Sequence, residues 1–184
     1  MKNALLLIDL QTGMDSPKWG PRNNPDAEQN AARLLQHWRA QSAPVFHVRH
    51  LSTTPGSPLH PDQGAIDYKA ETAPLPDEPS YDKSVNSAFI GTTLETDLRA
   101  AGITALTICG LITPHCVSTT TRMAANLGFA VTLAHDACAA FAAAADTSWC
   151  GSATFSAEQV HVMAVSELHG EFATARSTDD ILRT

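Results

Sequence analysis

The sequence predicts an α/β fold, a three-layer α/β/α sandwich around a central, mostly parallel sheet with Rossmann-like topology. Two short apolar runs, Ala4 to Asp9 and Pro44 to Val48, are typical of buried strands, and a helical pattern lies between them. A strand, a helix and a strand in this order form a crossover unit, which joins parallel strands. The same alternation resumes after residue 79 and continues toward the C-terminus.

The length and composition of the chain fit one globular domain, residues 1–184. A chain of 184 residues, 43% hydrophobic and 17% charged, can bury a full core. Its formal net charge of −7 argues against a nucleic-acid partner, which would need a basic face. No apolar run approaches the length of a signal sequence or a membrane span. We therefore expect a cytoplasmic protein that binds no nucleic acid and no membrane.

The first helix is predicted between Asp26, its N-cap, and Gln41. Its apolar residues are spaced for one helical face: Ala27, Ala31, Leu34, Leu35 and Trp38. Residues 51–79 are rich in proline and show little periodicity, which predicts one long ordered excursion over the surface. Loops of this length inside a compact domain usually act as lids or rims of a site.

The second half of the chain alternates between predicted helices and strands. The alanine-rich stretch Ala137 to Ala145 also favours a short packed helix, because alanine has the highest helix propensity. In chain order, the other elements are a helix over Thr92 to Ala101, a strand over Ala105 to Cys109, a helix from His115 or Cys116 to Leu127, a strand over Ala130 to His135, a helix over Ala157 to His169 and a candidate strand over Phe172 to Ala175.

Cys116 lies where a buried strand is predicted to turn into a helix. At a helix N-terminus, unpaired backbone N–H groups and the positive end of the helix dipole favour thiolate over thiol, so Cys116 is the candidate nucleophile. Asp9 ends the first strand, and the carboxyl ends of parallel strands meet at one edge, where ligands bind. The other cysteines, Cys109, Cys138 and Cys150, form no CxxC pair and are interpreted as inert free thiols.

Several motifs follow one another in a recognisable order along nearly the whole chain. They are Asp9 with Gln11, Tyr81-Asp-Lys83-Ser-Val-Asn-Ser-Ala-Phe89, Gly91-Thr-Thr-Leu94, Gly110-Leu-Ile-Thr-Pro-His-Cys116-Val-Ser-Thr-Thr-Thr-Arg-Met-Ala124, and Asp136-Ala-Cys138. Together these motifs resemble those of one known superfamily, the isochorismatase-like cysteine hydrolases, which include nicotinamidases, N-carbamoylsarcosine amidases and ureidoacrylate amidases.

The resemblance implies a catalytic triad of Asp9, Lys83 and Cys116. Cys116 would attack an amide carbonyl to form a thioester, Asp9 would move the proton, and Lys83 would favour the thiolate and hold the carboxylate. The resemblance also implies a cis peptide bond between Leu111 and Ile112. The backbone N–H groups of Ile112 and Cys116 would then form the oxyanion hole.

Histidines raise the question of a metal site. Nicotinamidases of this superfamily bind a metal through an Asp-x-His pair and a later histidine, but the segment His47-Val-Arg-His50 lacks that aspartate, and His60 does not complete a set. We therefore expect neither a metal nor another cofactor. Two roles remain open for His50: it lines the substrate pocket, or it hydrogen-bonds the following loop.

Five residues are candidates for substrate contacts: Gln11, His50, His115, Trp149 and Phe155. His115 faces either the pocket or a neighbouring subunit. Trp149 and Phe155 could belong to a lid, across a subunit boundary if necessary, although ordinary packing is the favoured interpretation. Asp136 is expected to brace the site or, preferably, to cap a helix.

The predicted function is a metal-independent cysteine amidohydrolase that acts on a small amide, ureido or carbamoyl compound and releases ammonia. One alternative is isochorismatase-type vinyl-ether hydrolysis, which does not depend on the cysteine. Another is a non-catalytic binding module on the same fold. A thiol-redox role is disfavoured because Cys116 has no neighbouring resolving cysteine. The resemblance further implies a homodimer or homotetramer, with a small molecule as the substrate.

Overall fold

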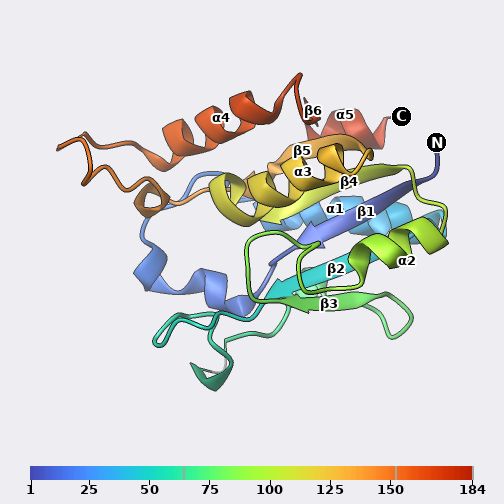
Figure 1. Cartoon of the computed structure of the whole chain (residues 1–184), viewed down its shortest axis with the longest axis horizontal. Helices are drawn as coiled ribbons and strands as arrows, with labels where there is room; N and C mark the ends of the chain where they lie inside the picture. Colours follow the sequence, from blue (N-terminus) through green and yellow to red (C-terminus); the bar gives the residue numbers. More distant parts are fainter. Residues whose placement is uncertain (64, 152, 184) are drawn as a thin grey trace.

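The computed structural model describes residues 1–63, 65–151 and 153–183, and its centre is a six-stranded sheet (Figure 1). The strands lie in the order β3-β2-β1-β4-β5-β6, and every neighbouring pair is parallel, as predicted. Their bounds are β1 Asn3–Ile8, β2 Val45–His50, β3 Ser80–Lys83, β4 Ala105–Leu111, β5 Ala130–Ala139 and β6 Thr174–Arg176.

Helices cover both faces of this sheet, which confirms the predicted three-layer sandwich. Figure 1 shows α1 behind the strands and α2 and α3 in front of them. Helix α5 packs against α1, and α4 packs against α3. In the described part of the chain, no helix combines the length and the apolarity needed to cross a bilayer. The helix bounds are α1 Ala27–Ala40, α2 Leu94–Ala100, α3 Ser118–Asn126, α4 Ala157–Leu168 and α5 Thr178–Leu182.

The hydrophobic core forms between the sheet and these helices. Strand β1 is apolar on both sides because helices cover both faces of a parallel sheet, and Leu5 to Ile8 are all buried. Leu34 and Leu35 of α1 belong to the same buried cluster. Burying one leucine side chain contributes about 1.5–3 kcal/mol, so this packing is a major source of stability. Helix α1 starts directly after Asp26 as predicted, although the Asp26 side chain makes no capping hydrogen bond.

The alanine-rich segment forms no α-helix, so the predicted helix over 137–145 is wrong. Strand β5 continues to Ala139, and only Ala142–Ala144 form a short 3-10 turn. Cys138 and Ala139 pair with the end of β4, and this tertiary pairing outweighs the helix propensity of alanine.

Strand β3 and helix α5 are absent from the sequence-based prediction. Only alternate residues of β3 are buried, Tyr81 and Lys83, and most of its residues are polar. Strand β3 therefore contains no apolar run that would predict a strand. Helix α5 is a single short turn, held by Asp136, whose Oδ1 accepts hydrogen bonds from Thr178 N and Oγ1 at 2.7 and 2.8 Å. Asp136 therefore has the structural role that the sequence favoured.

The strand order reverses between β1 and β4, and this switch point is where α/β sheets bind ligands. The two strands approach closely at Gly110, which pairs with Ile8. A Cβ atom on Gly110 would lie 2.0 Å from the Ile8 carbonyl oxygen, and Gly110 has φ +131°. Only glycine fits this position. Gly110 therefore allows the end of β4, and the segment with Cys116 that follows, to lie next to the end of β1.

Candidate active site

Asp9 follows β1 directly and is completely buried. Its φ of 54° is left-handed, a conformation that aspartate tolerates better than most residues, and it turns the chain at the sheet edge. Oδ2 of Asp9 accepts a hydrogen bond from Nζ of Lys83 at 2.7 Å. Oδ1 is also buried and accepts no hydrogen bond from any residue that the structure describes. Asp9 therefore keeps one buried oxygen available to receive a proton.

Lys83 ends β3 and places its ammonium at the centre of the site. Nζ donates to Oδ2 of Asp9 at 2.7 Å, to Sγ of Cys116 at 3.3 Å and to Nδ1 of His50 at 3.1 Å. The side chains of Lys83 and Asp9 are both fully buried. The structure thus brings together Asp9, Lys83 and Cys116, which are far apart in the sequence.

Cys116 lies in a π-helical turn, Thr113–Val117, that continues directly into α3. The residue is 8% exposed. Besides contacting Lys83, Sγ lies 3.7 Å from Oδ1 of Asn86. A carboxylate oxygen of Asp9 and a ring nitrogen of His50 lie within 4.8 Å of Sγ and of each other. The thiol therefore has a carboxylate and a cation within reach.

Burial acts against the charged form of Cys116, the effect opposite to that of a helix N-terminus. Burial raises the pKa of Cys116 well above its ordinary value, the Asp9 carboxylate raises it further, and Lys83 lowers it only in part. Burial also raises the pKa of Asp9, against the charge and hydrogen bond of Lys83. The cause of the raised pKa of Cys116 is that a charged thiolate loses its hydration in this site. A proton acceptor beside Sγ would therefore assist its reaction.

The peptide bond between Leu111 and Ile112 is cis, at the position that the resemblance implied. It joins the end of β4 to the turn that carries Cys116. Ile112 and Cys116 line the same cavity.

The cavity beside Cys116 has a volume of about 480 Å³. Its walls combine apolar and polar side chains, and among the residues that line it Lys18 carries the one permanent charge. Burial lowers the pKa values of both His50 and His115, so these imidazoles are neutral near pH 7. The lining residues are Met14, Lys18, Trp19, His50, Ser52, Thr54, Pro55, Gly56, Ser57, Pro58, Leu59, Asn86, Ile112, His115 and Cys116.

Two loops form the rim of this cavity. The loop after β2 contributes residues 52–59, which agrees with the predicted rim function of the 51–79 excursion. The loop after β1 contributes Met14, Lys18 and Trp19. Nζ of Lys18 donates to the Gly56 carbonyl at 2.8 Å and joins the two loops.

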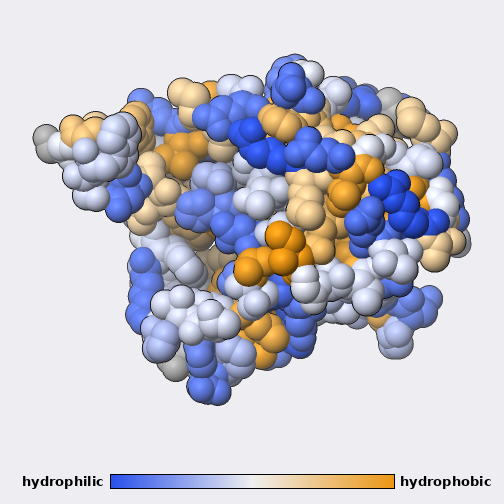
Figure 2. All heavy atoms as spheres, in the orientation of Figure 1, coloured by the Kyte–Doolittle hydropathy of each residue, from blue (hydrophilic) through white to orange (hydrophobic). Residues whose placement is uncertain are grey.

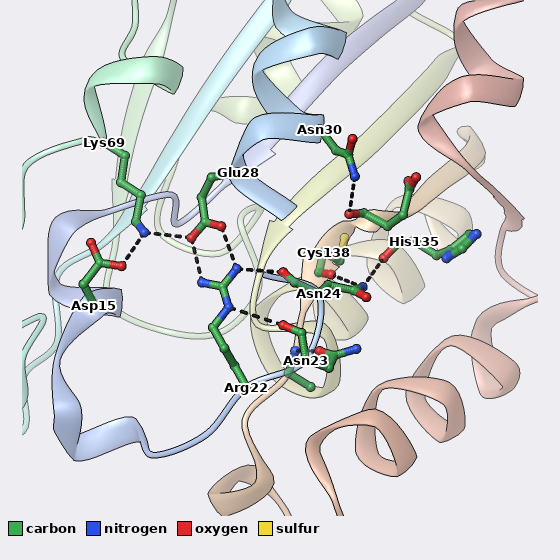
Figure 3. A network of polar contacts seen from close by, with 11 residues as sticks. Asp15, Arg22, Asn23, Asn24, Glu28, Asn30, Lys69, His135 and Cys138 are labelled. Carbon is green, nitrogen blue, oxygen red and sulfur yellow. Dashed lines mark hydrogen bonds and ion pairs between the residues drawn. The ribbon is translucent and has the colours of Figure 1, made fainter. Parts of the chain in front are cut away.

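A partly buried polar network anchors the loop after β1 to the body of the protein (Figure 3). Arg22 makes two hydrogen bonds to Glu28 of α1, at 2.7 and 2.6 Å. Lys69 donates to Glu28 at 2.7 Å and to Asp15 at 2.5 Å. Nδ2 of Asn24 donates to the Cys138 carbonyl of β5 at 2.7 Å. The cavity wall is therefore held by α1 and β5 rather than by its own short turns.

Three of the five predicted substrate contacts lie elsewhere. Gln11 is completely buried, and its amide is used by the backbone of His50 and Ile66. Trp149 is 84% exposed, in the segment before α4 that projects from the molecule in Figures 1 and 2. Phe155 is 49% exposed and lines a separate groove along α4. His50 and His115 do line the cavity.

The residues do not fit a metal site of the nicotinamidase kind. His47 is bonded to Glu78 at 2.8 Å, and His60 lies beside exposed Asp62. Within the described ranges, the one cluster with suitable spacing is Asp9, His50 and Cys116. The ammonium of Lys83 contacts all three of these residues, so a cation already occupies the place between them.

The sequence reasoning missed Asn86 and the wall residues Met14, Lys18 and Trp19. Asn86 lies in the motif that contains Lys83, which was the available signal. The wall residues carry no comparable signal, because they reach the cavity only through the anchored loop.

The fold and the site define an α/β protein with a thiol, a carboxylate and an ammonium at the switch point of its sheet. A model of the isochorismatase domain matches residues 3–180. The chain belongs to the isochorismatase family, a family of hydrolases that includes amidohydrolases.

Relatives and solved structures agree with this assignment. An uncharacterised isochorismatase family protein of Bacillus subtilis, YrdC, is 41% identical over 98% of this chain and 95% of its own length. A solved isochorismatase-family structure from Chromobacterium violaceum is 47% identical, with a TM-score of 0.92, and covers 99% of this chain and 92% of its own. The ureidoacrylate amidohydrolase RutB of Variovorax paradoxus is 35% identical over 73% of this chain and 49% of its own length.

Proposed function

We propose that this protein is a cysteine-dependent amidohydrolase that cleaves a small amide, ureido or carbamoyl compound through a thioester. One observation carries the proposal. Nζ of Lys83 contacts both Oδ2 of Asp9 and Sγ of Cys116, at 2.7 and 3.3 Å, and the thiol opens into a cavity of about 480 Å³. A base, a cation and a nucleophile beside one cavity are the components of covalent amide hydrolysis.

Acylation begins with Cys116 as a thiol. Asp9 takes the thiol proton as Sγ attacks the carbonyl carbon, and the carbonyl π electrons move to oxygen. The ammonium of Lys83 stabilises the negative charge that passes from Asp9 to sulfur. The tetrahedral intermediate then expels nitrogen, which receives the proton from Asp9. The C–N bond breaks, the thioester remains, and ammonia leaves when the substrate is a primary amide or a carbamoyl compound.

Deacylation uses the same groups in the reverse order. Asp9 removes a proton from a water molecule, whose oxygen attacks the thioester carbonyl. The C–S bond breaks, and the thiolate takes the proton back from Asp9, which regenerates the resting thiol and releases the acid. The backbone N–H groups of Ile112 and Cys116 are the proposed donors to the oxyanion in both steps. Their support is that both residues line the cavity.

The proposed reaction is independent of metal and of other cofactors. Its support is the ammonium of Lys83, which stands among Asp9, His50 and Cys116 and supplies the positive charge that a metal would bring. We expect turnover to be unchanged by a chelator.

A panel of small amides, ureido acids and carbamoyl compounds tests the proposal by ammonia release and by intact mass. The wild type should release ammonia from at least one compound, and its intact mass should increase by the mass of the bound acyl group. Cys116→Ala should do neither, whereas Cys150→Ser, which changes an exposed free thiol, should behave as the wild type. Turnover that survives Cys116→Ala would exclude the thioester and favour cysteine-independent hydrolysis. A complete absence of turnover and adduct would favour a binding module.

A further inference from the structure

His50 is the third acceptor of the Lys83 ammonium. The parallel register of β2 and β3 pairs these two residues directly. Nδ1 of His50 lies 3.1 Å from Nζ of Lys83. A lysine ammonium can only donate hydrogen bonds, so Nδ1 must be the acceptor and the neutral ring carries its proton on Nε2. The contact with Lys83 therefore defines the tautomer of His50.

The three N–H bonds of Lys83 match three acceptors. Asp9 and Cys116 take two of them, and His50 takes the third. Lys83 is 3% exposed and does not line the cavity, whereas His50 lines it. The imidazole thus contacts the ammonium and also lines the cavity, so in its absence water or substrate would be free to accept the third hydrogen bond.

The main chain of His50 is fixed by Gln11. Oε1 of Gln11 accepts a hydrogen bond from His50 N at 2.7 Å, and Nε2 of Gln11 donates to His50 O at 3.1 Å. Gln11 itself is completely buried and lies close to Asp9 in the chain. One side chain therefore hydrogen-bonds both the N–H and the carbonyl of His50 at the end of β2.

We propose that His50 is a positioning residue: it accepts the third N–H of Lys83 and so confines the ammonium between Asp9 and Cys116. This inference rests on the proposed function and adds one member to its site. Without the Nδ1 acceptor, one N–H of Lys83 is buried with no partner. This costs free energy, which favours a shift of the ammonium toward another acceptor. An ammonium drawn toward the cavity stabilises the developing thiolate of Cys116 less.

Alkylation of Cys116 by iodoacetamide tests this role without any substrate. The rate is followed by peptide mass spectrometry between pH 6 and 10 in the wild type, His50→Asn and His50→Leu. Asn is the matched control, because its Oδ1 takes the place of Nδ1, while Leu has similar size and no acceptor. Alkylation of exposed Cys150 in the same samples is the internal reference.

We expect His50→Leu to slow the alkylation of Cys116 by about tenfold or more and to move its pH profile upward. His50→Asn should stay within about threefold of the wild type, because it keeps the acceptor. Equal rates for Leu and wild type would overturn the proposal, and so would equal impairment of Asn and Leu. If His50→Leu does not fold, His50→Ala replaces it with the same expectation. An absence of amide turnover in the wild type would refute the proposed function and leave this readout intact.

Discussion

Nζ of Lys83 donates a hydrogen bond to Sγ of Cys116 across 3.3 Å, which places a buried positive charge directly against the thiol. The same nitrogen donates to Oδ2 of Asp9, so one side chain connects the carboxylate and the thiol. Under the proposed function, the ion pair supports thiol chemistry as well as local stability.

Replacement of this charge should reduce both turnover and thiol reactivity. Lys83→Met keeps the length of the side chain and removes the ammonium. We expect kcat to fall by about a hundredfold or more, since the loss of one preorganised electrostatic group in a buried site lowers kcat by about this factor. Alkylation of Cys116 at neutral pH should slow in parallel. Unchanged alkylation with lost turnover would instead assign Lys83 to the substrate.

Breaking the Asp9–Lys83 pair should destabilise the fold more than removing it whole. Both side chains are fully buried, so Asp9→Asn leaves an uncompensated ammonium. We expect a loss of about 3–5 kcal/mol in the free energy of unfolding for each single variant. The double variant, Asp9→Asn with Lys83→Met, should lose less than the sum of the two. Urea unfolding of the four proteins gives the coupling, and strict additivity would contradict it.

Stability should also fall at acidic pH because of Glu28. Burial raises the pKa of Glu28, but hydrogen bonds and charges from Arg22 and Lys69 outweigh it and lower the pKa from 4.5 to about 2. A depressed folded-state pKa gives stability that is present above the unfolded value and is lost as the pH falls through the folded value. The window therefore extends from pH 4.5 to about 2.

The contribution of Glu28 over this window is about 3 kcal/mol. Glu28→Gln should therefore be less stable than the wild type at pH 7 and should lose less stability than the wild type between pH 5 and 2. Urea unfolding at several pH values measures both slopes. Parallel slopes for the two proteins would show that other carboxylates determine the acid sensitivity.

Gly110 should not tolerate a side chain. Gly110→Ala brings Cβ to 2.0 Å from the Ile8 carbonyl oxygen, so β1 and β4 must separate. We expect a loss of about 3 kcal/mol or more in unfolding free energy, together with slower alkylation of Cys116. Gly128→Ala is the control, because its φ is +88° but nothing lies within 4 Å of the added Cβ. That variant should lose only about 1–2 kcal/mol and keep its thiol reactivity.

The sequence alone predicted most of the architecture, and it singled out Asp9, Lys83 and Cys116, which the structure places in contact. Asp9 and Cys116 follow apolar strands, and parallel strand ends meet at one edge of a sheet, so residue order and apolar pattern suffice to infer their proximity. The same reasoning failed for β3, whose residues alternate in burial, and for Ala137 to Ala139, where strand pairing outweighs helix propensity. Apolar periodicity is a local signal, and it weakens where tertiary contacts decide the conformation.

What the sequence by itself determined is the order of the main elements, because apolar spacing is a local property. Its motifs also singled out Asp9, Lys83 and Cys116, whose catalytic role stays a prediction. Only the tertiary structure decided that burial raises the pKa of Cys116, that His50 contacts the ammonium of Lys83, and which loop residues line the cavity. These features depend on burial and on distances between segments remote in the chain. They are defined only once the sheet and its helices have packed.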